Sequence, residues 1–587
     1  MATSKRSEWL ISEQAPREFL AALSGIHPLV MQVLWARGYR DLKEVSAFLA
    51  RDITRTDPFT LPDMAVAVER ILRAIREGEK IAVYGDYDCD GVTSCALLMQ
   101  VLRTLRANAQ VYIPDRFDEG YGLNAAALDA LHDQDVSLVI TVDCGARANA
   151  EARHAREIGL GLIVTDHHAL EDGHLPEALA VINPTRTDEA NTYPFRWLAG
   201  VGVAYRLAQA LLERYRDEDG LASPFDEGAL LDLVAIGTVA DVVPLVGENR
   251  ALVQAGLERI NTNPRIGVRY LAAAAGVKIG SVTAQTIGFG IGPRLNAAGR
   301  IKLAKDAFDI LDTSDETEAA QLARGLNERN EQRQRATEGV TRSAELKTLG
   351  DGQTDAPLLF ASSEDYSAGV IGLAASRLVE KFYKPAIVVA TQMGEARGSC
   401  RSVDGFNITA ALDECKDLLQ RHGGHAMAAG FTTSAVQLEP LRERLIEIAR
   451  RSQPDEGWTK QLRIDAIVNL HVTTDATLDN LNVLEPHGMG NMRPTFVARL
   501  ATVQSIRRVG RTHQHGDEAA PPGPHLQLRL KDSKGALWQA VGFHMGDRAD
   551  ELRVGSKVDV VFQLEVNEYM GERRLQLRLV DIAPQDN

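Results

Sequence analysis

Four short motifs of aspartate and histidine in this sequence have the residue types that bind divalent metal ions. They are Asp86-Tyr87-Asp88-Cys89-Asp90, Asp143-Cys144-Gly145, Asp166-His167-His168 and Ala240-Asp241. Carboxylate oxygens suit hard cations such as Mg²⁺, and imidazole adds affinity for transition metals such as Mn²⁺. A closed zinc site would instead favour cysteine and histidine. Two ions held close together can polarise a phosphate, generate hydroxide and stabilise a leaving oxygen.

The apolar runs before these motifs predict where the motifs lie in the fold. Runs at 81–84, 138–142 and 162–165 are typical of buried parallel strands, and the run at 230–240 is helix-like. The carboxyl ends of parallel strands form the ligand crevice of an open α/β sheet. A single aspartate at a strand end is more often a loop cap. Four such motifs in one domain favour a metal site, because so many carboxylates would repel each other without cations.

Composition limits the class of protein. A chain of 587 residues can hold several domains, and no apolar stretch reaches the roughly 18 residues that span a bilayer. The first residues lack the apolar core of a signal peptide, and the five cysteines fit no disulfide or zinc-ribbon spacing. These features predict a cytoplasmic protein with no membrane partner. Taken alone, the net charge of −15 argues against a nucleic-acid partner. It does not exclude one, because binding depends on local basic surface, and it predicts a narrow basic channel rather than a broad basic face.

The order of strand-like and helix-like patterns predicts an α/β protein of several parts. A helix is expected at 408–423, and the charged stretch at 313–347 predicts a linker helix. This helix is expected to be solvated, although Asn327, Asn330 and Arg333 lie on one side of it and could face a cleft. The expected parts are a helical segment at 1–55, a parallel-sheet domain at 56–265, a helical region with the linker helix at 266–350, a smaller α/β domain at 351–455 and a β-barrel, most simply an OB-fold, at 456–587.

Longer segments around the motifs resemble the DHH phosphoesterase superfamily, which is named for its Asp-His-His sequence. They are GDYDCDGVTS (85–94), IPDRFDEGYGLN (113–124), TVDCGA (141–146), TDHH (165–168) and GTVADVVPL (237–245). Within the superfamily they resemble the RecJ family of single-strand-specific DNA exonucleases. The segments at 397–402 and 423–426 resemble the DHHA1 domain that accompanies DHH. The resemblance covers nearly the whole chain.

The resemblance implies two divalent ions, Mn²⁺ or Mg²⁺, and assigns their ligands. Asp88 is expected to bind one ion and Asp90 the other, while Asp143 bridges them. His167 and Asp241 are expected to complete the site.

Three further residues of the same motifs receive roles from the resemblance. Asp86 is an additional candidate ligand, His168 is expected to contact the scissile phosphate, and Asp166 is expected to orient the histidines from outside the ligand shell. The expected catalytic group is therefore Asp88, Asp90, Asp143, His167, His168 and Asp241.

The resemblance also implies substrate contacts. Arg116, Ser399 and Arg401 correspond to family positions around a 5′-phosphate, and His425 follows a glycine pair that lets backbone approach a phosphate. Further contacts to nucleic acid are implied for Arg294, Asn296 and Arg300. The alternatives are a glycine-rich turn beside a buried histidine, and surface ion pairs for the arginines. Ser367 stands where the family often has histidine, so no role is carried over to that position.

The function that these patterns favour is a 5′→3′ exonuclease that degrades single-stranded DNA to mononucleotides in repair and recombination. The expected partners are single-stranded DNA with a 5′ end, a single-strand-binding protein and a helicase, and the expected state is a monomer. One alternative is a phosphodiesterase of nano-RNA or cyclic dinucleotides, which needs no strand-tracking barrel. Another is a non-catalytic replication scaffold, which would be expected to lose metal ligands. Arg507, Arg508, Arg511, Trp538 and Phe543 of the barrel could track the strand.

Overall fold

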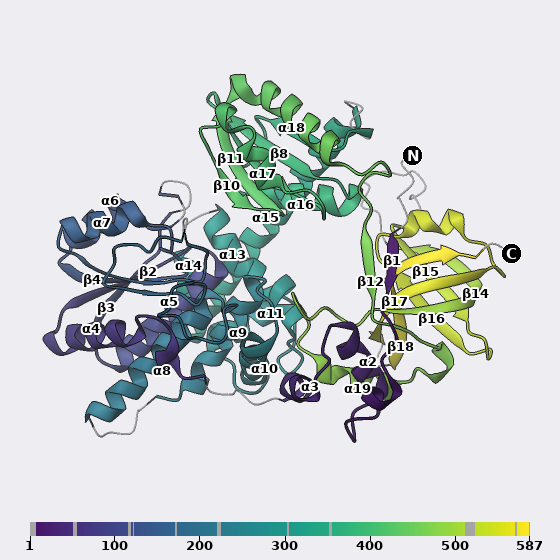
Figure 1. The fold of residues 1–587 in the computed structure, drawn as a ribbon, viewed down its shortest axis with the longest axis horizontal. Helices are drawn as coiled ribbons and strands as arrows, with labels where there is room; N and C mark the ends of the chain where they lie inside the picture. Colours follow the sequence, from purple (N-terminus) through teal and green to yellow (C-terminus); the bar gives the residue numbers. More distant parts are fainter. Residues whose placement is uncertain are drawn as a thin grey trace. The chain divides into compact units, whose positions relative to one another are not determined.

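The computed structural model describes residues 7–50, 56–115, 119–120, 122–170, 173–219, 225–301, 304–350, 355–510, 523–569 and 572–585. The chain forms two compact units (Figure 1). The large unit comprises Arg51–Asp455 and Pro486–Asn491, and the barrel unit comprises Met1–Ala50, Glu456–Glu485 and Met492–Asn587. The finer division into five parts stays a prediction.

A five-stranded parallel sheet forms the first half of the large unit, as the apolar runs predict. Its order is β3 (Asn108–Tyr112), β2 (Lys80–Gly85), β4 (Val136–Val142), β5 (Gly161–Thr165) and β6 (Ala180–Ile182). The strands are almost continuously buried, which is the expected pattern for a sheet covered on both faces.

Alternate strand residues face two separate cores. Ile81 and Ile140 point into the core that includes helices α4 (Met64–Glu77), α5 (Cys89–Thr104) and α8 (Gly200–Asp219). Ala82 and Val139 point into the core that includes α6 (Ala125–His132) and α7 (Asn149–Glu157). Helix α4 ends at Gly78, whose φ of 70° lies in the left-handed region that stops helices.

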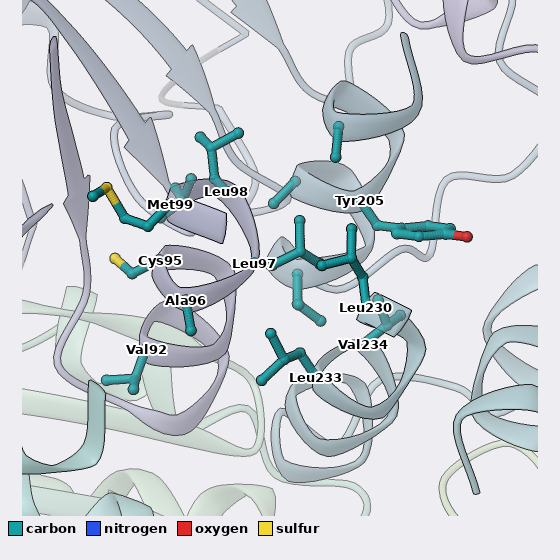
Figure 2. Close-up of a cluster of buried hydrophobic side chains, with 14 of the residues drawn as sticks. Val92, Cys95, Ala96, Leu97, Leu98, Met99, Tyr205, Leu230, Leu233 and Val234 are labelled. Carbon is teal, nitrogen blue, oxygen red and sulfur yellow. The ribbon is translucent and has the colours of Figure 1, made fainter. Parts of the chain in front are cut away.

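Helix α5 packs against α8 and α9 (Leu231–Ala240) through large apolar side chains (Figure 2). Leu97, Leu98 and Leu233 are fully buried in this contact. Close packing leaves little freedom for one helix to slide along another. It therefore fixes where the first turn of α5, the first turn of α8 and the last turn of α9 lie relative to each other.

A helical region follows. It comprises η2 (Glu227–Leu230), α10 (Gly247–Thr262), α11 (Ile266–Ala274), α12 (Ala284–Thr286), the π-helix η3 (Ile287–Ile291), α13 (Gly292–Ile301) and α14 (Lys305–Asp312). The predicted linker helix is α15 (Glu316–Gly350), which contacts α11, α13 and α14 and also α16 and β7 of the next sheet. Asn330 is buried on it, so this helix is not solvated on all sides.

The second sheet of the large unit has the order β10 (Arg421–His425), β11 (Ala428–Ser434), β9 (Glu395–Arg401), β8 (Ala386–Gln392) and β7 (Leu359–Ser363). Its helices are α16 (Ile371–Phe382), α17 (Ile408–Asp413) and α18 (Leu438–Ser452). The helix predicted over 408–423 is wrong in its second half. It ends at Asp413, and Arg421–His425 pairs with β11 instead, because tertiary pairing overrides the local helical pattern.

The barrel unit confirms the predicted OB-like barrel. Its sheet runs β13 (Ala466–Ile467), β14 (Phe496–Val509), β15 (His525–Lys531), β16 (Leu537–Gly542), β18 (Glu572–Pro584) and β17 (Lys557–Tyr569), and pairing of β14 with β17 closes it. Strand β1 (Glu8–Ile11) pairs with β12 (Gln461–Ile464). The other helices are α1 (Arg17–Leu20), α2 (Pro28–Ala36), α3 (Leu42–Leu49) and α19 (Asp475–Leu481).

The N-terminal segment is part of the barrel unit rather than an appendage. Val30, Met31 and Leu34 are buried in one core with Phe496 and Phe562 of the barrel strands. Among the described residues, each helix is too short or too polar to span a bilayer.

Candidate metal centre

The first motif forms the turn between β2 and α5. Asp88 caps the helix, because its Oδ1 accepts the backbone N–H groups of Asp90 at 2.9 Å and Gly91 at 3.1 Å. A Cβ at Gly91 would lie 2.5 Å from the carbonyl oxygen of Asp86, so only glycine lets the turn close this tightly. The spacing of the three aspartates thus places Asp86 before the helix, Asp88 at its cap and Asp90 in its first turn.

The other motifs bring their side chains to the same place. The Nε2 atom of His167, which follows β5, lies 3.2 Å from Oδ1 of Asp143, which follows β4. It also lies 3.5 Å from Oδ2 of Asp241, at the end of α9, and 3.9 Å from Oδ2 of Asp90. Asp143 has a φ of 60°, a strained value that is typical of functional sites when the residue is not glycine.

Three overlapping ligand groups result, each with ligand atoms within 4.8 Å of one another. The first is Asp90, His167 and Asp241, and the second is Asp86, Asp88 and Asp143. The third is Asp143, Asp166, His167 and His168, which shares His167 with the first and Asp143 with the second. The first group mixes nitrogen and oxygen donors, and the second offers oxygen alone. Both sets suit Mn²⁺, and the second also suits Mg²⁺.

Two buried atoms test whether a cation fits. Nε2 of His167 and Oδ1 of Asp143 face each other, and neither has a hydrogen-bond partner among the described residues. Buried polar atoms are almost always satisfied, so a facing pair of this kind indicates a ligand between or beside them. Burial lowers the pKa of His167 to about 4, which leaves its imidazole neutral and able to bind a metal.

Asp166 orients the histidine pair from outside this cluster. Its Oδ1 accepts the backbone N–H groups of His167 and His168 and lies 2.8 Å from Nδ1 of His168, while its Oδ2 accepts the N–H of Ala146. Burial is the largest single effect and opposes the charge on both partners, but their hydrogen bond and the attraction of neighbouring opposite charges together outweigh it. The pKa of Asp166 falls to about 2 and that of His168 rises to about 9. His168 is therefore a cation at neutral pH, held by Asp166.

The remaining carboxyls are destabilised as anions when no cation is present. Burial, followed by the negative charge of neighbouring aspartates, raises the pKa of Asp90 to about 7 and that of Asp241 to about 9. The same two causes raise the pKa of Asp143 well above its usual range. A bound divalent cation removes the reason for these shifts, because it stabilises the ionised forms.

Metal binding should therefore release protons. At pH 7 the metal-free protein holds protons on Asp241 and partly on Asp90, so binding of Mn²⁺ should release at least about one proton. The release should fall as pH rises above the pKa of Asp241, because the carboxyls are then already ionised. Isothermal titration calorimetry in two buffers of different ionisation enthalpy measures this quantity, and identical heats in both buffers at pH 7 would contradict the expectation.

The first turn of α8 holds Asp90 in place. Oδ2 of Asp90 accepts the N–H of Gly200 at 2.7 Å, and Oδ1 accepts the N–H of Val201 at 3.0 Å. The start of a helix favours negative charge, so this contact stabilises the buried carboxylate. A Cβ at Gly200 would lie 2.6 Å from Oδ1 of Asp143, and one at Gly237 would lie 2.7 Å from Oδ1 of Asp90. Two glycines thus make room for two ligands.

Sequence reasoning missed Gly200 and Gly237. For Gly237 a usable signal was present, because glycine inside a helix costs about 1 kcal/mol relative to alanine and calls for a compensating reason. Gly200 is the first residue of α8 and gives no such signal, although both glycines face carboxylates.

Gly200→Ala should weaken metal binding in a folded protein. The added methyl group displaces Asp143 or the N–H that Asp90 accepts, so we expect Mn²⁺ affinity to fall by about tenfold or more, as for other changes that misorient ligands. The measurement is Mn²⁺ binding by electron paramagnetic resonance, with circular dichroism to verify folding. The matched control is Gly202→Ala on the same helix, where the Cβ meets only the side chain of Leu198 at 3.2 Å. Equal loss in both variants would assign the effect to helix packing instead.

Helix α13 contacts the metal-binding turn. Oδ1 of Asn296 accepts the N–H of Cys89 at 2.8 Å, which ties this helix to the start of α5. Arg294 donates to Oδ1 of Asn327 and to the carbonyl oxygens of Gly290 and Ala274. Arg116 and the side chain of Arg300 lie outside the described residues. The roles predicted for these residues in nucleic-acid binding stay predictions.

The structure brings Ser399 and Arg401 together at the start of α16. Nη1 of Arg401 donates to Oγ of Ser399 at 3.2 Å, and a Cβ at Gly372 would lie 2.9 Å from the same oxygen. The ring of His425 is exposed on β10, so the alternative of a turn beside a buried histidine does not describe this segment. Ser367 is also exposed.

Comparisons with known proteins cover most of the chain. Residues 80–238 match the DHH family N-terminal domain, residues 355–451 match the DHHA1 domain, and residues 464–581 match the RecJ OB domain.

Full-length relatives agree with these matches. The single-stranded-DNA-specific exonuclease RecJ of Bacillus subtilis is 37% identical, over 99% of this chain and 71% of its own length. The crystal structure of RecJ from Thermus thermophilus in complex with Mn²⁺ has a TM-score of 0.82 and 31% identity, over 100% of this chain and 81% of that one. The Mg²⁺ complex has a TM-score of 0.76 and 30% identity, over 100% and 80%. On this similarity in sequence and fold, the chain belongs to the RecJ family.

Proposed function

We propose that this protein is a metal-dependent exonuclease that degrades single-stranded DNA from its 5′ end to mononucleotides, in DNA repair and recombination. The observation that carries the proposal is the convergence of three carboxylates on Nε2 of His167 within 4 Å. The RecJ relatives of this chain are named for the same substrate.

The candidate ligands form one set for each of the two ions. Asp90, His167 and Asp241 would hold one ion, Asp86 and Asp88 the other, with Asp143 placed to contact both. When bound, the ions neutralise the scissile phosphate and supply a hydroxide nucleophile.

His168 completes the reaction centre. It is cationic at neutral pH and its Nδ1 lies 2.8 Å from Oδ1 of Asp166, so an oriented positive charge is available to a phosphate oxygen. Its side chain is more exposed than that of His167, as a substrate contact requires.

We propose that the pair Ser399 and Arg401, called here the phosphate pocket, determines the direction of cleavage. Burial lowers the pKa of the Arg401 guanidinium, and no carboxylate among the described residues pairs with it. A buried guanidinium without an acidic partner is well suited to a phosphate, and the nearby start of α16 adds backbone N–H groups. We assign this pocket, with Arg116 and His425, to the 5′-terminal phosphate.

The candidate contact residues outside the metal centre suit single-stranded DNA as the partner. Arg294, Asn296 and Arg300 are assigned to the strand beyond the metal centre. The barrel adds Arg507, Arg508, Trp538 and Phe543, whereas Arg511 lies outside the described residues. A single-strand-binding protein and a helicase are proposed as further partners, and a cytoplasmic monomer as the working state.

Two other functions are less well supported. A phosphodiesterase of nano-RNA or cyclic dinucleotides would have no use for the barrel unit, whose domain matches RecJ relatives. A non-catalytic scaffold would not need to keep six metal-binding side chains in two compact groups.

Labelled oligonucleotides test the proposal directly. Single strands that carry a label at the 5′ or the 3′ end are incubated with Mn²⁺, Mg²⁺ or a chelator. A 5′ label should appear at once as a mononucleotide, whereas a 3′ label should move through progressively shorter strands. Cleavage in chelator, or release of a 3′-terminal mononucleotide first, would contradict the proposed chemistry or its direction.

Arg401→Ala should selectively impair use of 5′-phosphorylated ends. Loss of a charge-assisted contact of this kind costs about 1.5–3 kcal/mol, or roughly 10- to 150-fold in kcat/KM. The control is Arg397→Ala on the same strand, which removes an exposed guanidinium paired with Glu395. The measurement compares kcat/KM for 5′-phosphate and 5′-hydroxyl substrates, with Mn²⁺ affinity checked in parallel. An equal loss on both substrates would remove Arg401 from the phosphate pocket.

A further inference from the structure

The π-helix η3 presents an unusually exposed aromatic side chain. Phe289 is 82% exposed, more than any other phenylalanine or tryptophan among the described residues. Ile287 and Ile291, at the two ends of the segment, are fully buried and anchor it. Such segments are rare and occur frequently at functional sites. Phe289 therefore stands out from a fixed backbone rather than from a loose loop.

This segment lies against the end of α9 that carries a metal ligand. A Cβ at Gly288 would lie 3.7 Å from a methyl group of Val239, and one at Gly292 would lie 3.2 Å from the methyl group of Ala240. Asp241 is the next residue in the chain and ends the helix. The π-helix and the metal centre are thus separated by the last turn of one helix.

A second apolar side chain is exposed directly after the metal ligand Asp241. Val242 directly follows Asp241, has a φ of 64° and is 58% exposed. A β-branched residue in the left-handed region is a true outlier, and strain of this kind gathers at functional sites. The chain therefore keeps a strained, exposed valine beside the ligand instead of a glycine or asparagine.

Positive charge lies next to the π-helix. Arg294 donates to the carbonyl oxygen of Gly290, which ties it to the π-helix. Burial and the charges of Arg377 and Arg294 lower the pKa of Arg333, and its buried Nε has no hydrogen-bond partner among the described residues. The π-helix that carries Phe289 thus contacts the end of α9, next to a metal ligand, and also Arg294, whose neighbour Arg333 is suited to a phosphate.

We propose that Phe289 is a stacking surface for a base of the strand close to the nucleotide being removed, and that Val242 adds apolar surface next to Asp241. The proposal rests on the proposed function, because it takes the occupant to be single-stranded DNA. Unpaired bases offer both faces to an aromatic ring regardless of sequence. Bases of a duplex are stacked on each other and offer no free face. The surface therefore favours single strands over duplex DNA at the point of cleavage.

An abasic scan of the substrate tests this assignment. Single-stranded oligonucleotides with one base removed at successive positions from the 5′ end are compared by KM and kcat in Mn²⁺. For the wild type, one position should raise KM by about 5- to 150-fold, which is the range for loss of one stacked base. Phe289→Ala should raise KM on the intact strand by a similar factor, leave kcat nearly unchanged, and lose the sensitivity to that position.

Two further variants separate stacking from a structural effect. Phe289→Trp should keep the low KM and the abasic profile, because it preserves the aromatic face. Val436→Ala removes another highly exposed apolar side chain, outside the site, and should match the wild type. A wild-type KM for Phe289→Ala, or an unchanged abasic profile, would overturn the stacking assignment. A wrong proposed function would give a different result from a wrong stacking assignment, because the wild type would then not degrade the strand at all.

Discussion

Repulsion among buried carboxylates is the constraint on which the rest of this structure depends. Asp90, Asp143 and Asp241 lie within 4 Å of one imidazole nitrogen, and burial makes each of them a poor anion without a cation. Such groups would separate if they stood on flexible loops. They stay together because they come from strand ends and helix ends that are fixed by a common core.

That core explains why candidate metal ligands so far apart in sequence meet. The contact of α5 with α8 and α9 brings the start of two helices and the end of a third to one edge of the parallel sheet (Figure 2). The start of α8 donates two N–H groups to Asp90, and the cap of α5 orders Asp88. Backbone groups therefore offset part of the cost of burying these charges, and the cations offset the rest.

Sequence patterns predicted the parts of this site that depend on local chemistry. The apolar runs before Asp86 and Asp143 gave the strands correctly, because a sheet buried on both faces has a simple hydrophobic signature. Gly200 was missed because its role depends on Asp143, which lies far away in the chain. The helix expected beyond Asp413 failed for the same reason, since pairing with β11 is a long-range contact.

Net charge gave a misleading indication of the partner, and the structure explains why. Part of the net charge of −15 comes from carboxylates of the metal centre, which require cations, whereas surface ion pairs add nothing to the sum. Arg401 and Arg333 are partly buried and have no carboxylate partner among the described residues. A phosphate that binds the large unit would therefore meet arginine side chains whose positive charge is not apparent from the net charge of the chain. In the proposed function, these few unpaired charges and the exposed aromatic faces determine the affinity for a strand.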